Sequence, residues 1–300
     1  MQRFTAACAQ FACVPMDVQA NVDKAVSWTH RAVDESGAQL VVLPETLTTG
    51  FVPNVDRAAL WDMVDAIPGR VTEPLQRASQ RLGIYLVFGT YERGPQRGDV
   101  YNSAALLGPN GDVLGIYRKT HLFPTEACGW SIPGNQPVVV HTPLASIGMT
   151  ICFDGDFPEL YRAEAVLGAE VIARPSALLR SYEIWELTNR ARAYDNHVYI
   201  LGCNAVGPDA GENYYFGHSM IVDPIAHTLA QARGTEEVIS AELNPDPIKY
   251  ITYGSKSPMV FDHLELRNLE AYRNILTPAK SRFRPAPLPE GAKREGVATE

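Results

Sequence analysis

The feature that most constrains the fold is the alternation of short apolar segments with segments of helix length. Residues 38–45 form a short apolar segment, which is typical of a strand buried on both faces, and residues 170–177 and 197–205 are also predicted strands. Amphipathic or capped segments predict helices over residues 17–37, 72–83, 157–169 and 181–196. Hairpins are expected over residues 100–119 and 219–232. The pattern therefore predicts an α/β fold of layered, mixed sheets.

Local signals also set helix ends and the domain boundary. Asp17 is a predicted N-cap, Gly37 a predicted helix stop, and Pro158 is suited to a first helical turn. No internal repeat or interior linker interrupts residues 1–277, so we expect one domain there. Residues 278–300 are rich in proline and lack apolar periodicity. We expect this tail to be extended or packed on a partner.

Composition narrows the function classes. Hydrophobic residues make up 46% of the 300 residues, and the net charge is −8 without a basic cluster, which argues against nucleic acid as a partner. No apolar run approaches the length of a membrane span. The five cysteines are few and odd in number, without a Cys-x-x-Cys pair or metal-ligand spacing. We therefore expect a cytoplasmic protein with reduced thiols, no metal site and no membrane partner.

Three reactive residues stand at the ends of apolar segments. Glu45 ends one strand-like run, Lys119 ends another, and Cys152 ends the run of residues 146–152. Sites in layered α/β folds collect at the carboxyl ends of strands. The three side chains could act together in catalysis, because a carboxylate can take a thiol proton and an ammonium can stabilise the anion formed when sulfur attacks carbon. Each residue alone is more often a solvated or packed strand end.

The sequence around these residues resembles the nitrilase superfamily of carbon–nitrogen hydrolases. The resemblance rests on three motifs in order, LPET at 43–46, YRKTHLFPTE at 117–126 and ICFDGDFPEL at 151–160, and runs over residues 4–243. It implies a four-layer α-β-β-α sandwich. It also implies a homodimer or a higher even-numbered homo-oligomer, with C-terminal segments that reach onto the partner.

The resemblance assigns a role to each motif residue. Cys152 is the expected nucleophile, Glu45 the general base and later acid, and Lys119 the cation that stabilises the tetrahedral intermediate. Glu126 is the only acid between Lys119 and Pro133-Gly134, and it is the expected second glutamate. No metal and no organic cofactor is required.

The turn after Cys152 supplies further candidates. The amide of Phe153 is the expected second oxyanion donor. The helix expected to begin at Pro158 would direct its positive dipole end toward the thiol and favour the thiolate. Cys128 and His218 are additional candidates for the pocket wall, although structural roles are at least as common for such residues.

Asp156 is the main departure from the family pattern. Members that act on acids carry an arginine at this place, which can meet a substrate carboxylate. An aspartate there predicts neutral or cationic amides as substrates, unless Arg174 or Arg180 restores the positive charge. Asp156 would alternatively cap the helix that follows.

The reaction within the family stays open from the sequence. A small amide converted to its acid and ammonia is the favoured reaction, since Phe153 and Asp154 replace the Trp-Glu that follows the cysteine in nitrilases proper. Hydrolysis of an N-carbamoyl amine is the main alternative, followed by hydrolysis of a nitrile. A catalytically inactive scaffold on the same fold is the remaining alternative, and the intact Glu45, Lys119 and Cys152 argue against it.

Overall fold

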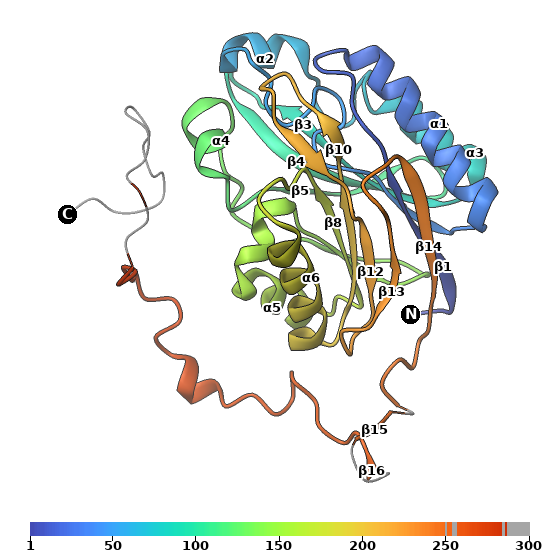
Figure 1. The fold of residues 1–300 in the computed structure, drawn as a ribbon, viewed down its shortest axis with the longest axis vertical. Helices are drawn as coiled ribbons and strands as arrows, with labels where there is room; N and C mark the ends of the chain where they lie inside the picture. Colours follow the sequence, from blue (N-terminus) through green and yellow to red (C-terminus); the bar gives the residue numbers. More distant parts are fainter. Residues whose placement is uncertain (250, 254–256, 284–285, 287–300) are drawn as a thin grey trace.

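Two six-stranded sheets form the body of the protein (Figure 1). The computed structural model describes residues 1–249, 251–253, 257–283 and 286. The first sheet has the order β14 (Glu237–Leu243), β1 (Phe4–Gln10), β2 (Leu40–Val42), β3 (Tyr85–Arg93), β4 (Val100–Leu107), β5 (Val113–Arg118). The second has the order β13 (Thr228–Gln231), β12 (Met220–Val222), β9 (Tyr199–Asn204), β8 (Val171–Ser176), β7 (Ser146–Met149), β6 (Val139–His141).

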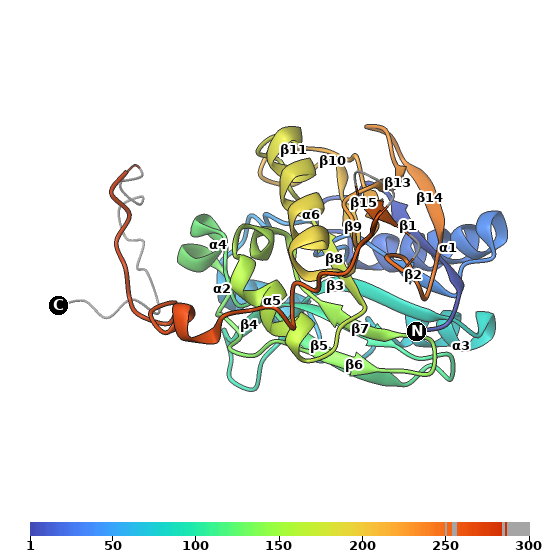
Figure 2. The ribbon, with the colours of Figure 1, turned by 90° about the horizontal axis from the view of Figure 1, so that it is seen from below.

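Helices cover the outer face of each sheet (Figure 2). Helices α1 (Val18–Ser36) and α3 (Glu73–Leu82) lie over the first sheet, and α5 (Pro158–Val166) and α6 (Tyr182–Asn196) lie over the second. Each sheet mixes parallel and antiparallel neighbours, with β1, β2 and β3 parallel in the first and β7, β8 and β9 parallel in the second. The arrangement is the predicted four-layer α-β-β-α sandwich.

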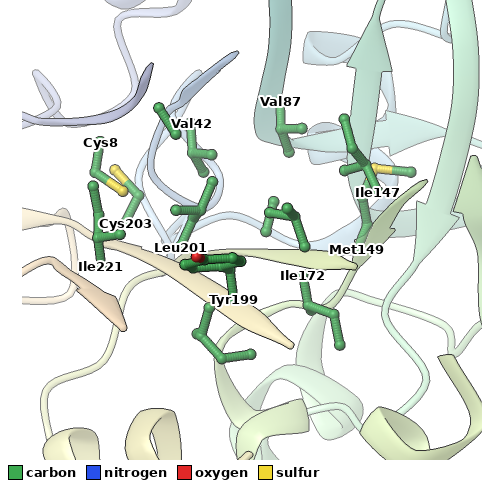
Figure 3. Packing of buried hydrophobic residues seen from close by; sticks show 14 of the residues in the cluster. Cys8, Val42, Val87, Ile147, Met149, Ile172, Tyr199, Leu201, Cys203 and Ile221 are labelled. Carbon is green, nitrogen blue, oxygen red and sulfur yellow. The ribbon is translucent and has the colours of Figure 1, made fainter. Parts of the chain in front are cut away.

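The main core lies between the two sheets (Figure 3). Cys8, Val42 and Val87 point inward from the first sheet, and Met149 and Leu201 face them from the second. A second core cluster fills the space between the first sheet and α1 and α3. Burial on both faces explains why β2 is apolar at every position rather than at alternate ones.

The predicted helix ends agree with the structure. The Asp17 carboxylate accepts a hydrogen bond from the Ala20 amide at 3.0 Å, and Gly37 ends α1 in the left-handed region at φ 66°. Pro158 lies in the first turn of α5.

Several short elements were not predicted. They are α2 (Arg57–Met63), α4 (Pro124–Gly129), β6, β10 (Val206–Pro208), β11 (Tyr214–Phe216), β15 (Thr252–Tyr253) and β16 (Ser257–Pro258), with the 3₁₀ helices η1 (Cys152–Asp156) and η2 (Leu269–Tyr272). Each has fewer than eight residues, which is too short for a helical or alternating hydrophobic pattern to be recognised in the sequence. Two of them, α4 and η1, carry site residues.

After β14 the chain leaves the sheets and runs along the outside of α5, as Figures 1 and 2 show in orange and red. Residues 268–283 are all exposed. Most of the predicted tail, residues 278–300, lies outside the described residues, so the boundary at 277 stays a prediction. None of the helices in the described ranges is long and apolar enough to cross a membrane.

Candidate active site

The three reactive residues lie together beyond the carboxyl ends of their strands. Glu45 follows β2, Lys119 follows β5, and Cys152 follows β7. Their exposed fractions are only 1%, 1% and 8%. Gly89 on β3 permits the close approach at Glu45, because a Cβ atom there would lie 2.6 Å from the Glu45 Cα. The two sheets therefore bring together Glu45 and Cys152, which are more than 100 residues apart in sequence.

Lys119 lies between two buried carboxylates. Its Nζ donates hydrogen bonds to Glu45 Oε1 at 2.8 Å and to Glu126 Oε2 at 2.9 Å, and it lies 5.2 Å from the centroid of the Phe51 ring. Glu126 comes from α4 and is completely buried. The structure thus brings Glu126 to the same cluster as the other predicted residues.

The charged groups in this cluster shift one another's pKa values. Burial lowers the pKa of Lys119, but the charges of Glu126 and Glu45 outweigh it and leave the pKa above its ordinary value. Burial also raises the pKa of Glu126, and Glu45 adds to this while Lys119 opposes it. Lys119 is therefore a permanent cation at neutral pH.

Asn102 on β4 is a site residue that the sequence analysis missed. Its Nδ2 donates to Glu45 Oε1 at 2.7 Å and to Glu126 Oε1 at 2.8 Å, so it bridges the two acids opposite Lys119. The side chain is fully buried. One signal existed in the sequence: Asn102 stands in the largely apolar strand segment VYNSAALL, where a buried amide needs a partner.

The backbone of Cys152 has a conformation that is uncommon for a residue with a side chain. Its φ is 43°, in the left-handed region, at the start of η1. Such a turn presents the sulfur toward the cavity, as a nucleophile requires. Burial raises the pKa of the thiol to about 12; Glu45 adds to the shift, and Lys119 and Arg174 oppose it. Desolvation therefore outweighs the positive charges near the thiol, so the resting thiol is neutral, and the contribution of the helix that begins at Pro158 stays a prediction.

Arg174 lies beneath Cys152 rather than in the pocket. Its side chain is completely buried, and its Nε and Nη2 donate to the Cys152 carbonyl oxygen at 3.0 and 2.5 Å. The remaining Nη1 donates to Asn189 at 2.8 Å and to Thr188 at 3.0 Å, both on α6. This placement corrects the expectation that Arg174 binds substrate, because every donor group faces the protein interior.

Asp154 joins the lysine motif to the cysteine motif, a link that the sequence analysis did not predict. Its carboxylate accepts from the Ile151 amide at 2.9 Å, from the Tyr117 hydroxyl at 2.7 Å and from the His121 amide at 3.1 Å. The side chain is fully buried. One carboxylate therefore fixes the spacing between the segment that carries Lys119 and the one that carries Cys152.

A small cavity opens over the Cys152 sulfur. Its volume is about 20 Å³. It is lined by Phe51, Phe123, Cys152, Phe153, Ala177, Leu178, Leu179 and Arg180. The walls are thus aromatic and aliphatic apart from the thiol and one guanidinium. A cavity of about 800 Å³ elsewhere, between α5 and the C-terminal segment, contains none of the predicted catalytic residues.

Asp156 faces Arg180 at the edge of this cavity. Its two oxygens accept from the two terminal nitrogens of Arg180 at 2.7 and 2.8 Å. Phe157, not Asp156, is the N-cap of α5, and no side chain caps that helix. The alternative role of Asp156 as a helix cap is therefore wrong.

Two further candidates lie away from the cavity lining. Cys128 is exposed on α4. His218 packs against the rings of Tyr182 and Phe216, and its carbonyl oxygen accepts from the Trp185 indole at 2.6 Å. Both placements are ordinary structural ones.

Residues 5–252 match the sequence model of the carbon-nitrogen hydrolase family. The chain belongs to that family. An omega-amidase from Xenopus tropicalis is 31% identical over 254 residues, which cover 81% of this chain and 90% of that protein. A protein named nitrilase from Pyrococcus abyssi is 38% identical over 224 residues, which cover 72% of this chain and 82% of that protein.

Solved structures of carbon–nitrogen hydrolases have the same fold. A glutamine variant of the amidase from Nesterenkonia sp. AN1 gives a TM-score of 0.76 at 27% identity, covering 91% of this chain and 100% of that one. That variant carries the product of acrylamide addition at its active-site cysteine. The predicted family, four-layer fold and amidase class of carbon–nitrogen hydrolase are confirmed.

Proposed function

We propose that this carbon–nitrogen hydrolase converts small, uncharged carboxylic amides to the acid and ammonia through a thioester on Cys152. The observation that carries the proposal is the buried Lys119 ammonium, held between Glu45 and Glu126 beside the thiol. A thiol, a base and a cation in one pocket are the groups that acyl transfer to sulfur requires. The amidase names of the relatives support the amide class.

In the acylation step, Cys152 gives its proton to Glu45 as the sulfur attacks the amide carbon. Oε2 of Glu45 accepts from the Ala177 amide at 2.7 Å, and the same amide faces the Cys152 thiol. Because the pKa of the thiol is about 12, the thiolate forms only as the proton moves to the base. Glu45 then returns the proton to the nitrogen, the carbon–nitrogen bond breaks, and ammonia leaves.

Lys119 stabilises the negative charge that develops on the substrate oxygen. The ammonium is already held by two carboxylates, so it needs little reorganisation when the tetrahedral intermediate forms. The amide of Phe153 is the proposed second donor to that oxygen. Glu126 and Asn102 hold Lys119 and Glu45 at their positions, and Glu126 also balances the charge of the ammonium.

Water completes the reaction. After ammonia leaves, Glu45 takes a proton from a water molecule, whose oxygen attacks the thioester carbon. The carbon–sulfur bond breaks, the sulfur recovers a proton from Glu45, and the carboxylic acid leaves. Arg174 is the proposed positioning residue for both steps, because it holds the Cys152 carbonyl oxygen.

The cavity supports small acyl groups. Its volume is only about 20 Å³, so the cavity favours the smallest acyl groups, and the lining side chains must move apart when an acyl group binds. The walls offer apolar contact, and their one guanidinium is already paired with Asp156. We therefore propose short, uncharged acyl chains as the substrates.

We also propose that the protein works in the cytoplasm as an even-numbered homo-oligomer. The five cysteines are free, as expected for reduced thiols. Large apolar side chains are exposed along the C-terminal segment, among them Leu266 at 69%, Leu276 at 91% and Phe283 at 91%. A row of this kind on a soluble chain is typical of a surface that a second copy covers.

An ammonia-release screen tests the function. Acetamide, propionamide and butyramide would be compared with the matching nitriles and with N-carbamoyl amines of the same length. The proposal expects the highest kcat/KM for an amide. A nitrile or an N-carbamoyl amine as the best substrate would replace the proposed reaction by one of the alternatives, and the 38% identical nitrilase makes the nitrile series a necessary comparison.

A further inference from the structure

The lining of the cavity over Cys152 includes the Arg180 guanidinium, which already pairs with Asp156. Arg180 comes from the loop between β8 and α6, while Asp156 ends η1. The pair is bidentate, with nitrogen–oxygen distances of 2.7 and 2.8 Å, and both side chains are 27% exposed. Such planar, two-point pairing is the geometry by which arginine binds a carboxylate.

The guanidinium lies on the reacting side of the site. Arg180 lines the same cavity as the Cys152 sulfur, and its Cζ lies 5.3 Å from the centroid of the Phe153 ring. The hydrogen bonds that Arg180 donates to Asp156 raise the pKa of Arg180 above its ordinary value, burial opposes this, and the charges of Asp156 and Cys152 add to it. Because Arg180 and Cys152 line one cavity, Arg180 is positioned to contact the acyl group of a substrate bound at Cys152.

We propose that Asp156 is a built-in occupant of a carboxylate site on Arg180, and that the pair determines specificity by excluding acyl groups that carry a carboxylate. This inference rests on the proposed amide hydrolysis and specifies its substrate class. A substrate carboxylate would have to displace Asp156, which would leave two carboxylates beside one guanidinium in a partly dry pocket. An uncharged acyl chain meets the Asp156–Arg180 ion pair, in which the two charges cancel, and is not repelled.

This account differs from simple repulsion by an unpaired aspartate. Repulsion alone would disappear when Asp156 is removed and would leave no preference. The Asp156–Arg180 pair makes a stronger prediction, because removal of Asp156 exposes a site that attracts a carboxylate. The specificity should therefore reverse rather than merely relax, and the reversal should depend on Arg180.

The test compares two amides of one shape. Succinamate carries a terminal carboxylate, and 4-oxopentanamide has a methyl group in place of one carboxylate oxygen. The ratio of kcat/KM for succinamate to that for 4-oxopentanamide would be measured for the wild type, Asp156→Ala, Asp156→Glu and the double variant Asp156→Ala/Arg180→Gln. Asp62→Ala is the matched control, because it removes an exposed aspartate on α2 that pairs with Arg97.

The proposal expects a ratio below about 0.1 for the wild type and an increase of at least about 30-fold in Asp156→Ala, mostly through the KM for succinamate. Asp156→Glu keeps a carboxylate on Arg180 and should stay near the wild type. The double variant should lose the increase, and Asp62→Ala should not show it. A ratio in Asp156→Ala within threefold of the wild-type value would overturn the proposal.

A binding measurement separates this inference from the proposed function. Titration calorimetry with succinate should give a dissociation constant at least about tenfold lower for Asp156→Ala than for the wild type or the double variant. Equal constants would overturn the inference even if all variants hydrolyse neutral amides. If the wild type hydrolyses no amide while succinate still binds Asp156→Ala through Arg180, the proposed reaction fails and the carboxylate site stands.

Discussion

The Arg174 guanidinium holds the carbonyl oxygen of Cys152 through two hydrogen bonds, of 3.0 and 2.5 Å. The third nitrogen is fixed by Asn189 and Thr188 on α6. Cys152, the proposed nucleophile, is therefore positioned through its own backbone. Since Cys152 has a positive φ, this contact compensates for a conformation that a side-chain-bearing residue rarely adopts.

Gly155→Ala tests this positioning without touching a reacting group. A Cβ atom at Gly155 would lie 2.0 Å from Arg174 Nη2, so the guanidinium would have to move. We expect kcat to fall by about 10²-fold with little change in KM, because the nucleophile loses its alignment rather than its chemistry. Gly129→Ala is the control, because nothing lies within 4 Å of its added Cβ. Unchanged kcat in a folded Gly155→Ala protein would contradict the positioning role.

Asn102→Asp tests the bridge between the two acids. The change keeps the shape, removes the donor that Glu45 and Glu126 share, and adds a third acid to a cluster with one lysine. We expect kcat/KM to fall by about 10²-fold or more, since the charge balance of the site is lost. The exposed Asn274→Asp serves as the control. If Asn274→Asp slows hydrolysis to the same extent, the loss comes from the overall charge of the protein, and the bridging role of Asn102 is contradicted.

Glu164→Gln tests a buried acid that the reaction does not use. Glu164 on α5 is completely buried, and neither carboxyl oxygen meets hydrogen-bond geometry with a described residue. Burial raises the pKa of Glu164 well above its ordinary value, the charge of Asp154 adds to this, and the backbone at Met149 and Val138 opposes it. The folded protein therefore holds this carboxyl in its neutral form.

The sign of the pH effect follows from that shift. Glu164 contributes fully to stability below its unfolded pKa of about 4.3, and the contribution declines as pH rises toward the folded pKa. Urea unfolding at fixed protein concentration measures the free energy of unfolding of Glu164→Gln relative to that of the wild type. This difference should increase in favour of Glu164→Gln by on the order of 1 kcal/mol or more between pH 5 and pH 8. Exposed Glu35→Gln should show no such trend. Parallel stability curves for Glu164→Gln and the wild type would mean that the carboxyl is ionised in the fold.

The sequence predicted those parts of the molecule whose signals are local. Asp17 and Gly37 bound α1 because caps act within one turn, and the central strands were recognisable because burial on both faces leaves a continuous apolar run. Glu45, Lys119 and Cys152 were found because each ends such a run. Their contacts were not derivable from spacing, since separate strands of two sheets bring them together.

The parts that were missed depend on pairings across the fold. Asp156 and Arg180 are 24 residues apart and meet only because η1 and the loop after β8 adjoin the same cavity. Arg174 was expected in the pocket, but an arginine inside a buried strand can point to either face, and here it points toward α6. The net direction of the pKa shift at Cys152 was not derivable from the sequence, because a helix start is a local signal, whereas burial is a property of the whole fold.

Truncation tests the proposed assembly. Deleting residues 278–300 should weaken self-association more than it lowers the unfolding temperature, because this tail lacks the periodicity of a core element. Leu276→Asp, at a side chain that is 91% exposed, should act in the same direction. Light scattering at micromolar concentration measures both, with Val14→Asp on another surface as the control. A monomeric full-length protein would exclude the proposed assembly.

The covalent role of Cys152 is the central claim, and amide turnover with intact-protein mass spectrometry tests it most directly. Cys152→Ala should lower kcat by more than about 10³-fold while the protein stays folded, and Glu45→Gln and Lys119→Ala should each be nearly as damaging without adding to that loss. The wild type, quenched in acid during turnover of butyramide, should gain the mass of one butyryl group on the peptide that contains Cys152, and Cys152→Ala should gain none. Turnover by Cys152→Ala within tenfold of the wild type, or an acyl group on another residue, would contradict the account.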